Sequence, residues 1–270
     1  AAVRRWQGGR MPLSTELGAA VEAVLDGPRD SPELRALSPL LDLQARESAL
    51  PTPHTLLVES VRTRQGAALF VYPFAGRTVH EGMAALFALR WGRLSPHTFV
   101  YAVNDYGFVL NSPQRTPVDA GLITRLLTSD RWLEDLQDSM NLTEMARRQF
   151  REIARVAGML MPSLPGGARR SARQLQASSG LLFDVLQRHD PAHLLLDQAV
   201  REVFEAQLDV QALSAAFERC AARTIDLRHP RTLTPLSFPL WAETVRGELS
   251  TEDWSTRVRR AAEQLQARHG

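Results

Sequence analysis

Two predicted β-hairpins, set among segments with helical periodicity, constrain the fold of this chain more than any other feature. Residues 55–63 and 67–74 read as strands around an Arg-Gln-Gly turn, and residues 97–104 and 107–112 do so around Asn-Asp-Tyr-Gly. Hairpins of this kind build small antiparallel sheets or parts of barrels. We therefore expect an antiparallel, barrel-like sheet. Two hairpins are few for a closed barrel, so we also expect that an upstream part of the chain is missing.

The other segments predict helices, and several of them begin with a typical cap. Ser14 precedes apolar residues at helical spacing, and Ser31 followed by Pro32 opens a second helix. Further helices are expected at about residues 79–91 and through most of the chain after residue 117, with one returning strand at 222–229. The predicted fold class is therefore α+β, helix-dominated, with the hairpin sheet surrounded by α-helices.

The chain is predicted to contain three segments. Residues 1–13 form a basic N-terminal segment that continues from the missing upstream part. Residues 14–116 hold helices and both hairpins, and residues 117–270 are mainly helical with the one returning strand. Because 270 residues suit one large domain, we expect the segments to form a single integrated domain.

Composition excludes several kinds of chemistry. All 32 basic residues are arginines, so this chain has no lysine for a P-loop, a Schiff base or a covalent adenylate. The single Cys220 cannot form an internal disulfide, and its helical neighbours predict a small buried side chain. No apolar run reaches the ~18 residues of a membrane span, and no signal peptide is recognisable. We expect a cytoplasmic chain with no membrane partner.

The arginines are unevenly distributed. Residues 1–10, 60–80 and 153–183 contain arginines and no acidic residue, whereas residues 190–226 carry more acids than arginines. Basic stretches without acids are what a phosphate backbone requires. Arginines that pair with acids elsewhere in the fold would leave the same pattern, so this feature alone does not decide between the two.

Two of these basic stretches predict contacts with a nucleic acid. A Gly-rich loop runs into a helix capped by Ser171, where helix amides and guanidinium groups can meet one anion, and two glutamines follow that can bond a base edge. The residues concerned are Arg169, Arg170, Arg173, Gln174 and Gln176. At the N-terminus, Trp6 lies among Arg4, Arg5 and Arg10. An exposed tryptophan there can stack on a base; a buried core tryptophan is the alternative.

Signals for catalysis are weak. His189 and His193 are four residues apart but lack the glutamate of a zinc-binding HExxH helix, and no nucleophile elbow is present. We assign no catalytic or metal residue and expect no cofactor in this chain. Gln174 and Gln176 beside the basic loop leave a glycosylase-like, base-excising module open. The acidic helices between Asp190 and Glu218 leave a docking module for a protein partner open.

Longer stretches resemble a known family. The segments RWQGGRMPLS, LFVYPFAGRTVHEGMAALFALR, SARQLQASSGLLFDVLQRHDPAHLLLDQAVREV and TPLSFPLWAETVR follow one another between about residues 5 and 260. In this order and spacing they are similar to the C-terminal part of the large helicase-related (Lhr) proteins. The resemblance is strongest to the DNA ligase-associated DEXH-box helicases of bacteria.

The resemblance implies that the chain is most of a fourth, C-terminal domain that follows two RecA-like motor domains and a winged helix. Family members use ATP and Mg to move 3′ to 5′ on single-stranded DNA and to unwind duplexes, including RNA:DNA hybrids. For this chain it implies an accessory nucleic-acid-binding role in a DNA repair helicase, with base stacking by Trp6. Whether the chain is an enzyme by itself stays open.

The same resemblance implies the partners of the chain. They are single-stranded DNA or an RNA:DNA hybrid, the upstream winged-helix and motor domains, and a DNA ligase or nuclease. It also implies a bacterial, nucleoid-associated location.

Overall fold

The structure of the 270-residue chain is a computed structural model. It describes residues 14–63, 66–114, 117–128, 130–139, 146, 150–151, 153–160, 172–207, 210–246 and 254–269. The chain divides into two compact units, of which the first combines residues 1–135 with 211–270 and the second contains residues 136–210. The chain leaves the first unit after residue 135 and returns to it for its last sixty residues.

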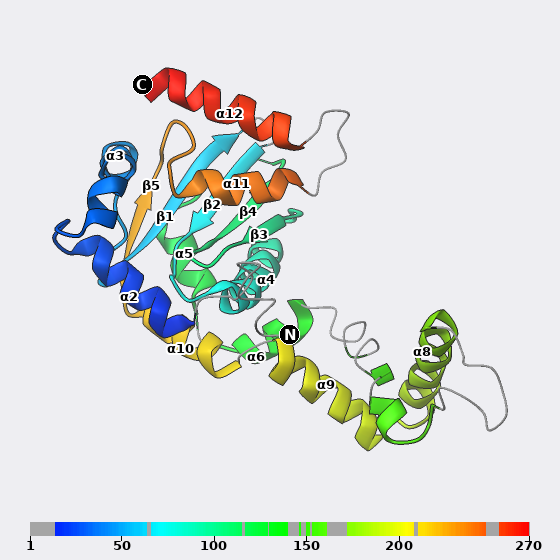
Figure 1. Cartoon of the computed structure of the whole chain (residues 1–270). Coiled ribbons are helices and arrows are strands. Elements are labelled where there is room, and N and C mark those ends of the chain that lie inside the picture. The colour runs from blue at the N-terminus through cyan, green and yellow to red at the C-terminus, as the bar shows by residue number, and fades with distance from the viewer. Residues whose placement is uncertain are drawn as a thin grey trace. The chain divides into compact units, whose positions relative to one another are not determined.

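Five strands of the first unit form one sheet in the order β3-β4-β2-β1-β5 (Figure 1). Their bounds are β1 Thr55–Thr63, β2 Gly66–Val71, β3 Val100–Val103, β4 Phe108–Ser112 and β5 Thr224–Arg228. Both predicted hairpins are confirmed as antiparallel pairs. The returning strand β5 instead pairs parallel to β1.

The antiparallel hairpins and the α+β class are confirmed, but the barrel-like form of the sheet is not. Among the described strands, β3 and β5 are the two edges of an open sheet, and β5 makes the sheet mixed. A parallel strand must be reached by a long crossover, which here runs through several helices. Helices then cover both faces of the sheet, so the sheet buries its apolar side chains without closing on itself.

Strand alternation separates the two faces of the sheet. Leu57, Val61 and Phe70 belong to a core with Leu240 and Trp241 of helix α11 (Ser237–Arg246), which lies across this face in Figure 1. The intervening positions belong to the other face, which packs on helix α4 (Arg77–Leu94). There the Phe108 and Phe87 ring centroids are 5.2 Å apart, edge to face.

Helix α4 is buried along most of its length. It also contacts α5 (Ala120–Leu126) and α10 (Val210–Ala221), where the Phe87 and Phe217 ring centroids are 6.5 Å apart. A helix buried on all sides has no distinct polar face, and α4 accordingly mixes apolar residues with buried His80 and Arg90. The predicted helix at 79–91 is confirmed and is longer by two residues at its start and three at its end.

The two predicted N-terminal helices are also confirmed. α2 (Thr15–Asp26) begins where the Ser14 hydroxyl accepts a hydrogen bond from the Leu17 amide, and α3 (Pro32–Glu47) begins in the same way at Ser31. Gly18 lets α2 pack closely on the backbone that follows β2, because a Cβ at this position would come within 2.1 Å of the Phe74 carbonyl oxygen.

The last helix of the first unit is α12 (Trp254–His269). Helix α6 (Trp132–Ser139) starts at the end of the first unit's first segment and continues into the second unit. The second unit contains α8 (Ala172–His189) and α9 (Leu194–Gln207) around a small core in which the Phe150 and Phe183 rings meet edge to face. In the described part of the chain, no helix has both the length and the apolar character needed to span a membrane.

Candidate nucleic-acid interface

The residues predicted from the sequence to bind a nucleic acid fall where the structure gives no side-chain description. Trp6, Arg4, Arg5, Arg10, Arg169 and Arg170 lie outside the described residues. Arg173, Gln174 and Gln176 belong to α8, but their side chains are not described. The roles of these nine residues stay predictions.

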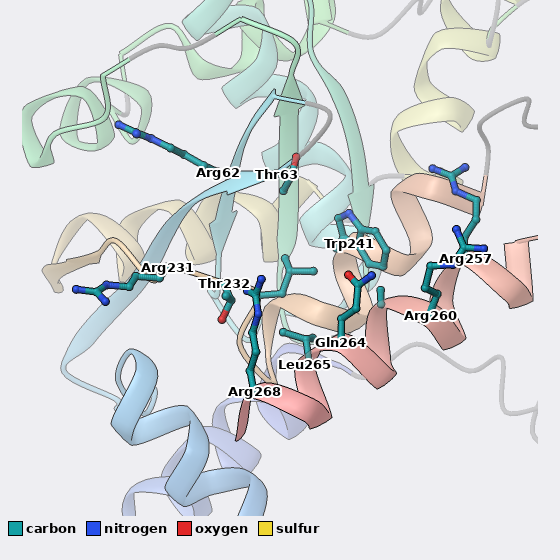
Figure 2. Close-up of a pocket in the computed structure, with 12 residues that line it drawn as sticks. Arg62, Thr63, Arg231, Thr232, Trp241, Arg257, Arg260, Gln264, Leu265 and Arg268 are labelled. Carbon is teal, nitrogen blue, oxygen red and sulfur yellow. The ribbon is translucent and has the colours of Figure 1, made fainter. Parts of the chain in front are cut away.

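A different group of arginines surrounds a cavity of about 570 Å³ in the first unit, which we call the basic cavity (Figure 2). Three parts of the chain line it: the end of β1, the loop from β5 to α11 with α11 itself, and α12. Its lining residues are Arg62, Thr63, Arg231, Thr232, Leu233, Trp241, Arg257, Arg260, Ala261, Gln264, Leu265 and Arg268.

Helix α12 supplies most of the polar lining. Arg257, Arg260, Gln264 and Arg268 follow one another at intervals of three, four and four residues, which places them on one face of a helix. Figure 2 shows Arg260, Gln264 and Arg268 extending from α12 along the cavity. Arg259, on the same helix, is exposed and does not line the cavity.

The sheet supplies the other two arginines. Glu59 and Arg228 form the last pair between β1 and β5, and Arg62 and Arg231 each lie three residues further along the chain. The parallel register therefore brings both arginines to the same end of the sheet. Both are exposed, and neither forms an ion pair with a described residue.

The lining makes the basic cavity a site for an anion. Among the residues described, five arginines and no acidic side chain line it. Guanidinium groups stay charged at any physiological pH and present planar, forked donors that match phosphate oxygens. Thr63, Thr232 and Gln264 add polar groups that can bond a sugar or a base edge, and Trp241 and Leu233 add apolar surface.

A second cavity of about 600 Å³, the flanking cavity, shares Arg62 and Arg231 with the basic cavity. Its other lining residues are Ser60, Val61, Ala67, Pro117, Val118, His229 and Pro230. As far as the chain is described, this lining contains no acidic side chain either. The two arginines therefore form a shared wall between two recesses of the same charge.

The loop that carries Arg231 is anchored by a buried carboxylate. Glu59 is fully buried on β1 and accepts hydrogen bonds from Gln44 Nε2 at 2.8 Å, Tyr72 Oη at 2.9 Å and Thr234 Oγ1 at 2.8 Å. Burial, with the Glu59 carboxylate beside it, raises the pKa of the Tyr72 hydroxyl well above 10, so that hydroxyl stays a donor. Four parts of the chain thus meet at one side chain.

The same anchor sets the start of α11. The Ser237 amide donates to Thr234 Oγ1 at 3.1 Å, while the Thr234 amide donates to Ser237 Oγ at 2.7 Å. This reciprocal pair satisfies amides that a helix start leaves without partners. Residues 231–233 of the basic cavity are therefore held between β5 on one side and this anchored turn on the other.

The titratable groups buried elsewhere in the first unit do not suit catalysis. His80 Nε2 accepts from the Ala75 amide at 3.0 Å and Nδ1 donates to the Asn104 carbonyl oxygen at 2.7 Å, and burial lowers its pKa to about 4. Cys220 is buried, as the sequence predicts, and burial raises the pKa of its thiol to about 11. The described residues contain no cluster of side chains that could hold a metal ion.

Sequence reasoning found only part of this site. Arg62 lies in the acid-free stretch 60–80 that was singled out, but Arg231, Arg257, Arg260 and Arg268 were missed. They lie near acidic residues in the sequence, which hides them from a search for acid-free stretches. The signal that could have found three of them is their helical spacing.

Comparison with known proteins identifies the family. The family model described as DEAD/H associated matches residues 50–237, which include Arg62 and Arg231 and end before α12. The chain belongs to the DEAD/H associated family. The matched residues include all five strands of the sheet. They therefore include the β1 and β5–α11 loop residues that line the basic cavity, but not those of α12.

The chain is also similar to archaeal helicases of the Lhr type. It is 27% identical over 168 residues to the ATP-dependent helicase Lhr-Core protein 2 of Thermococcus barophilus, covering 62% of this chain and 19% of that protein. It is 24% identical over 224 residues to the ATP-dependent helicase Lhr-Core of Methanocaldococcus jannaschii, covering 83% of this chain and 26% of that protein. The chain thus spans about a fifth to a quarter of these relatives.

A solved structure shares the fold. The helicase Lhr of Mycobacterium smegmatis, bound to ssDNA and AMP-PNP, matches with a TM-score of 0.68 and 21% identity. The match covers 85% of this chain and 32% of the mycobacterial chain. Together these comparisons confirm the resemblance to Lhr proteins that the sequence segments indicated.

Proposed function

We propose that this chain is an accessory nucleic-acid-binding domain of an ATP-dependent helicase of the Lhr type. The observation that carries the proposal is the basic cavity, where five arginines from β1, a loop and α12 converge without an acidic side chain among the described residues. The names of the relatives and the share of their length that this chain spans support a role within a larger helicase.

The finer parts of the proposal come from the resemblance. The domain stands at the C-terminal end of a bacterial, ligase-associated DEXH-box helicase that acts in DNA repair. Its motor domains bind ATP and Mg, move 3′ to 5′ on single-stranded DNA and unwind DNA or RNA:DNA duplexes. This chain contains no lysine and therefore no P-loop, so the motor belongs to another part of the protein.

The residues of the basic cavity divide into two roles. The arginines bind phosphate oxygens through paired N–H groups, which gives affinity without selecting a sequence. Thr63, Thr232 and Gln264 bond sugars or base edges, and Leu233 and Leu265 contact base faces. The anchored turn at Thr234 keeps Arg231 in place, so the site loses little conformational freedom when it binds.

The proposal is tested by binding measurements on the 270-residue chain. The double variant Arg231→Gln/Arg268→Gln should bind a labelled single-stranded oligothymidylate of about 12 nucleotides at least about tenfold more weakly in fluorescence anisotropy. The slope of log affinity against log salt should become shallower by about 0.7 for each lost phosphate contact. The matched control Arg259→Gln removes one charge from α12 outside the cavity and should have little effect.

The arginines predicted near residues 1–10 and 169–173 remain in every variant. A loss of binding in the double variant can therefore be assigned to the basic cavity. If the double variant binds as tightly as the control, the basic cavity does not bind nucleic acid and the proposal fails.

The other two functions considered from the sequence have less support. The base-excising module was predicted at Gln174 and Gln176, whose side chains are not described, so it stays a prediction. Docking of a DNA ligase or nuclease stays a prediction. Nucleic-acid binding is therefore the function that the geometry supports best.

A further inference from the structure

We propose that one single strand occupies the basic cavity and the flanking cavity together, with its backbone crossing between them at Arg62 and Arg231. This inference rests on the proposed function, because it names the nucleic acid that the same site binds. It states that the site recognises several consecutive phosphates of an unpaired strand, and neither one isolated phosphate group nor a duplex.

The shared wall is the first observation. Arg62 and Arg231 line both cavities, and their surroundings on either side are free of acidic side chains in the described lining. An anion bound at this wall has basic or neutral surface in both directions. A ligand that extends in both directions gains contacts in each cavity, whereas a single phosphate group leaves one of them unused.

The length of the basic surface is the second observation. Arg257 and Arg268 are eleven residues apart on α12, which corresponds to roughly 16 Å along the helix axis. In Figure 2, Arg62 and Arg231 lie on one side of Trp241 and Arg257 and Arg260 lie on the other. Arginines spread over this length can contact more than one phosphate of a strand.

Apolar surface beside the arginines favours an unpaired strand. The basic cavity includes Leu233 and Leu265, and the flanking cavity includes Val61, Pro117 and Pro230. In a duplex the base faces stack on one another, so only unstacked bases can enter such recesses and lie on apolar side chains. Each cavity has a volume within the range of roughly 300–1,000 Å³ that holds a small-molecule-sized group such as a nucleotide.

The test separates length from charge. Thymidine 3′,5′-bisphosphate, tetrathymidylate and a short hairpin duplex compete with the labelled oligothymidylate for the 270-residue chain. The bisphosphate carries at least as much negative charge as the three internal phosphates of the tetranucleotide, since each terminal phosphate has a charge of about −1.5 to −2 at neutral pH. We expect the tetranucleotide to compete at least about tenfold better than the bisphosphate and better than the duplex.

Variants locate the crossing point. Arg62→Gln/Arg231→Gln should remove most of the advantage of the tetranucleotide over the bisphosphate. Arg268→Gln, in the basic cavity alone, should weaken both ligands by a similar factor and keep the advantage. Arg259→Gln is the matched control and should change neither.

The possible failures are distinguishable. If the bisphosphate competes as well as the tetranucleotide, or the duplex competes better, while Arg268→Gln still weakens binding, the strand path is overturned and the proposed function stands. If no ligand depends on any cavity arginine, both the strand path and the proposed function are overturned.

Discussion

On the α4 face of the sheet, His80 and Arg90 are enclosed and meet protein atoms in several directions. Arg90 donates from Nε to Asp135 Oδ2 at 2.8 Å and from Nη1 to the Leu126 carbonyl oxygen at 2.7 Å, and His80 bonds two backbone groups. On the α11 face, Glu59 is equally enclosed, whereas Arg62 and Arg231 at one end of the sheet are exposed and line two cavities.

This difference separates groups that hold the fold from groups that are available to a ligand. Buried polar groups are stable only when hydrogen bonds replace the water they lose. His80, Arg90 and Glu59 have those bonds within the protein. Arg62 and Arg231 are exposed and form no ion pair with a described residue, so their charges can be satisfied by phosphate. The enclosed groups thus stabilise the fold, and the exposed arginines at the end of the sheet are the groups available to a ligand.

The largest effect on stability is expected from Glu59→Ala. This change leaves the buried donors of Tyr72, Gln44 and Thr234 without the carboxylate, and each buried donor that loses its partner costs about 1–3 kcal/mol. We expect the free energy of unfolding to fall by about 4 kcal/mol in urea titrations followed by circular dichroism. Binding to single strands should fall with it, because the loop that carries Arg231 loses its anchor.

Glu59→Gln is the matched variant for this prediction. The amide keeps the size of the side chain and one carbonyl oxygen, and the hydroxyls of Tyr72 and Thr234 can rotate to accept from its NH₂ group. It should cost less than half as much as Glu59→Ala. Equal stability of the alanine variant and the unmodified chain would show that the network contributes nothing.

The next largest effect is the pH dependence of the free energy of unfolding that comes from buried His80 on the α4 face. The pKa of His80 is about 4 in the folded chain because burial disfavours the charged form, whereas the usual value is 6.5. The unfolded chain therefore takes up the proton first as the pH falls. The contribution of neutral His80 to the free energy of unfolding is fully present above pH 6.5. It is lost as the pH falls from 6.5 to 4, by roughly 3 kcal/mol in total.

The variant His80→Gln isolates this contribution from the carboxylates that titrate in the same range. Glutamine can accept and donate hydrogen bonds but does not titrate. The difference in unfolding free energy between the unmodified chain and this variant should shrink steadily from pH 7 to pH 4. A difference that stays constant across that range would mean that His80 is not held neutral by the fold.

The smallest effect on stability is expected in the basic cavity. Arg62→Gln and Arg268→Gln remove exposed charges, and surface substitutions of this kind change the free energy of unfolding by about 0.5 kcal/mol or less. The same denaturant titrations measure this change. A loss of more than about 2 kcal/mol in either variant would place that arginine among the groups that hold the fold, and would break the distinction between the two classes.

Much of the local structure was predictable because it depends on neighbouring residues. The caps at Ser14 and Ser31, both hairpins and the buried Cys220 follow from short-range hydrogen bonding and alternation, and the structure confirms them. The site was less predictable, because Arg231 and Arg268 meet Arg62 only through the parallel β1–β5 pair and the return of α12.

The sequence by itself determined the helix-dominated α+β class, the family and the absence of any lysine chemistry, since these depend on composition, periodicity and resemblance. Only the tertiary structure decided that the sheet is open and mixed and that five arginines from distant segments line one cavity. The physical reason is that strand order and the meeting of distant side chains depend on long-range pairing, which local sequence patterns do not specify.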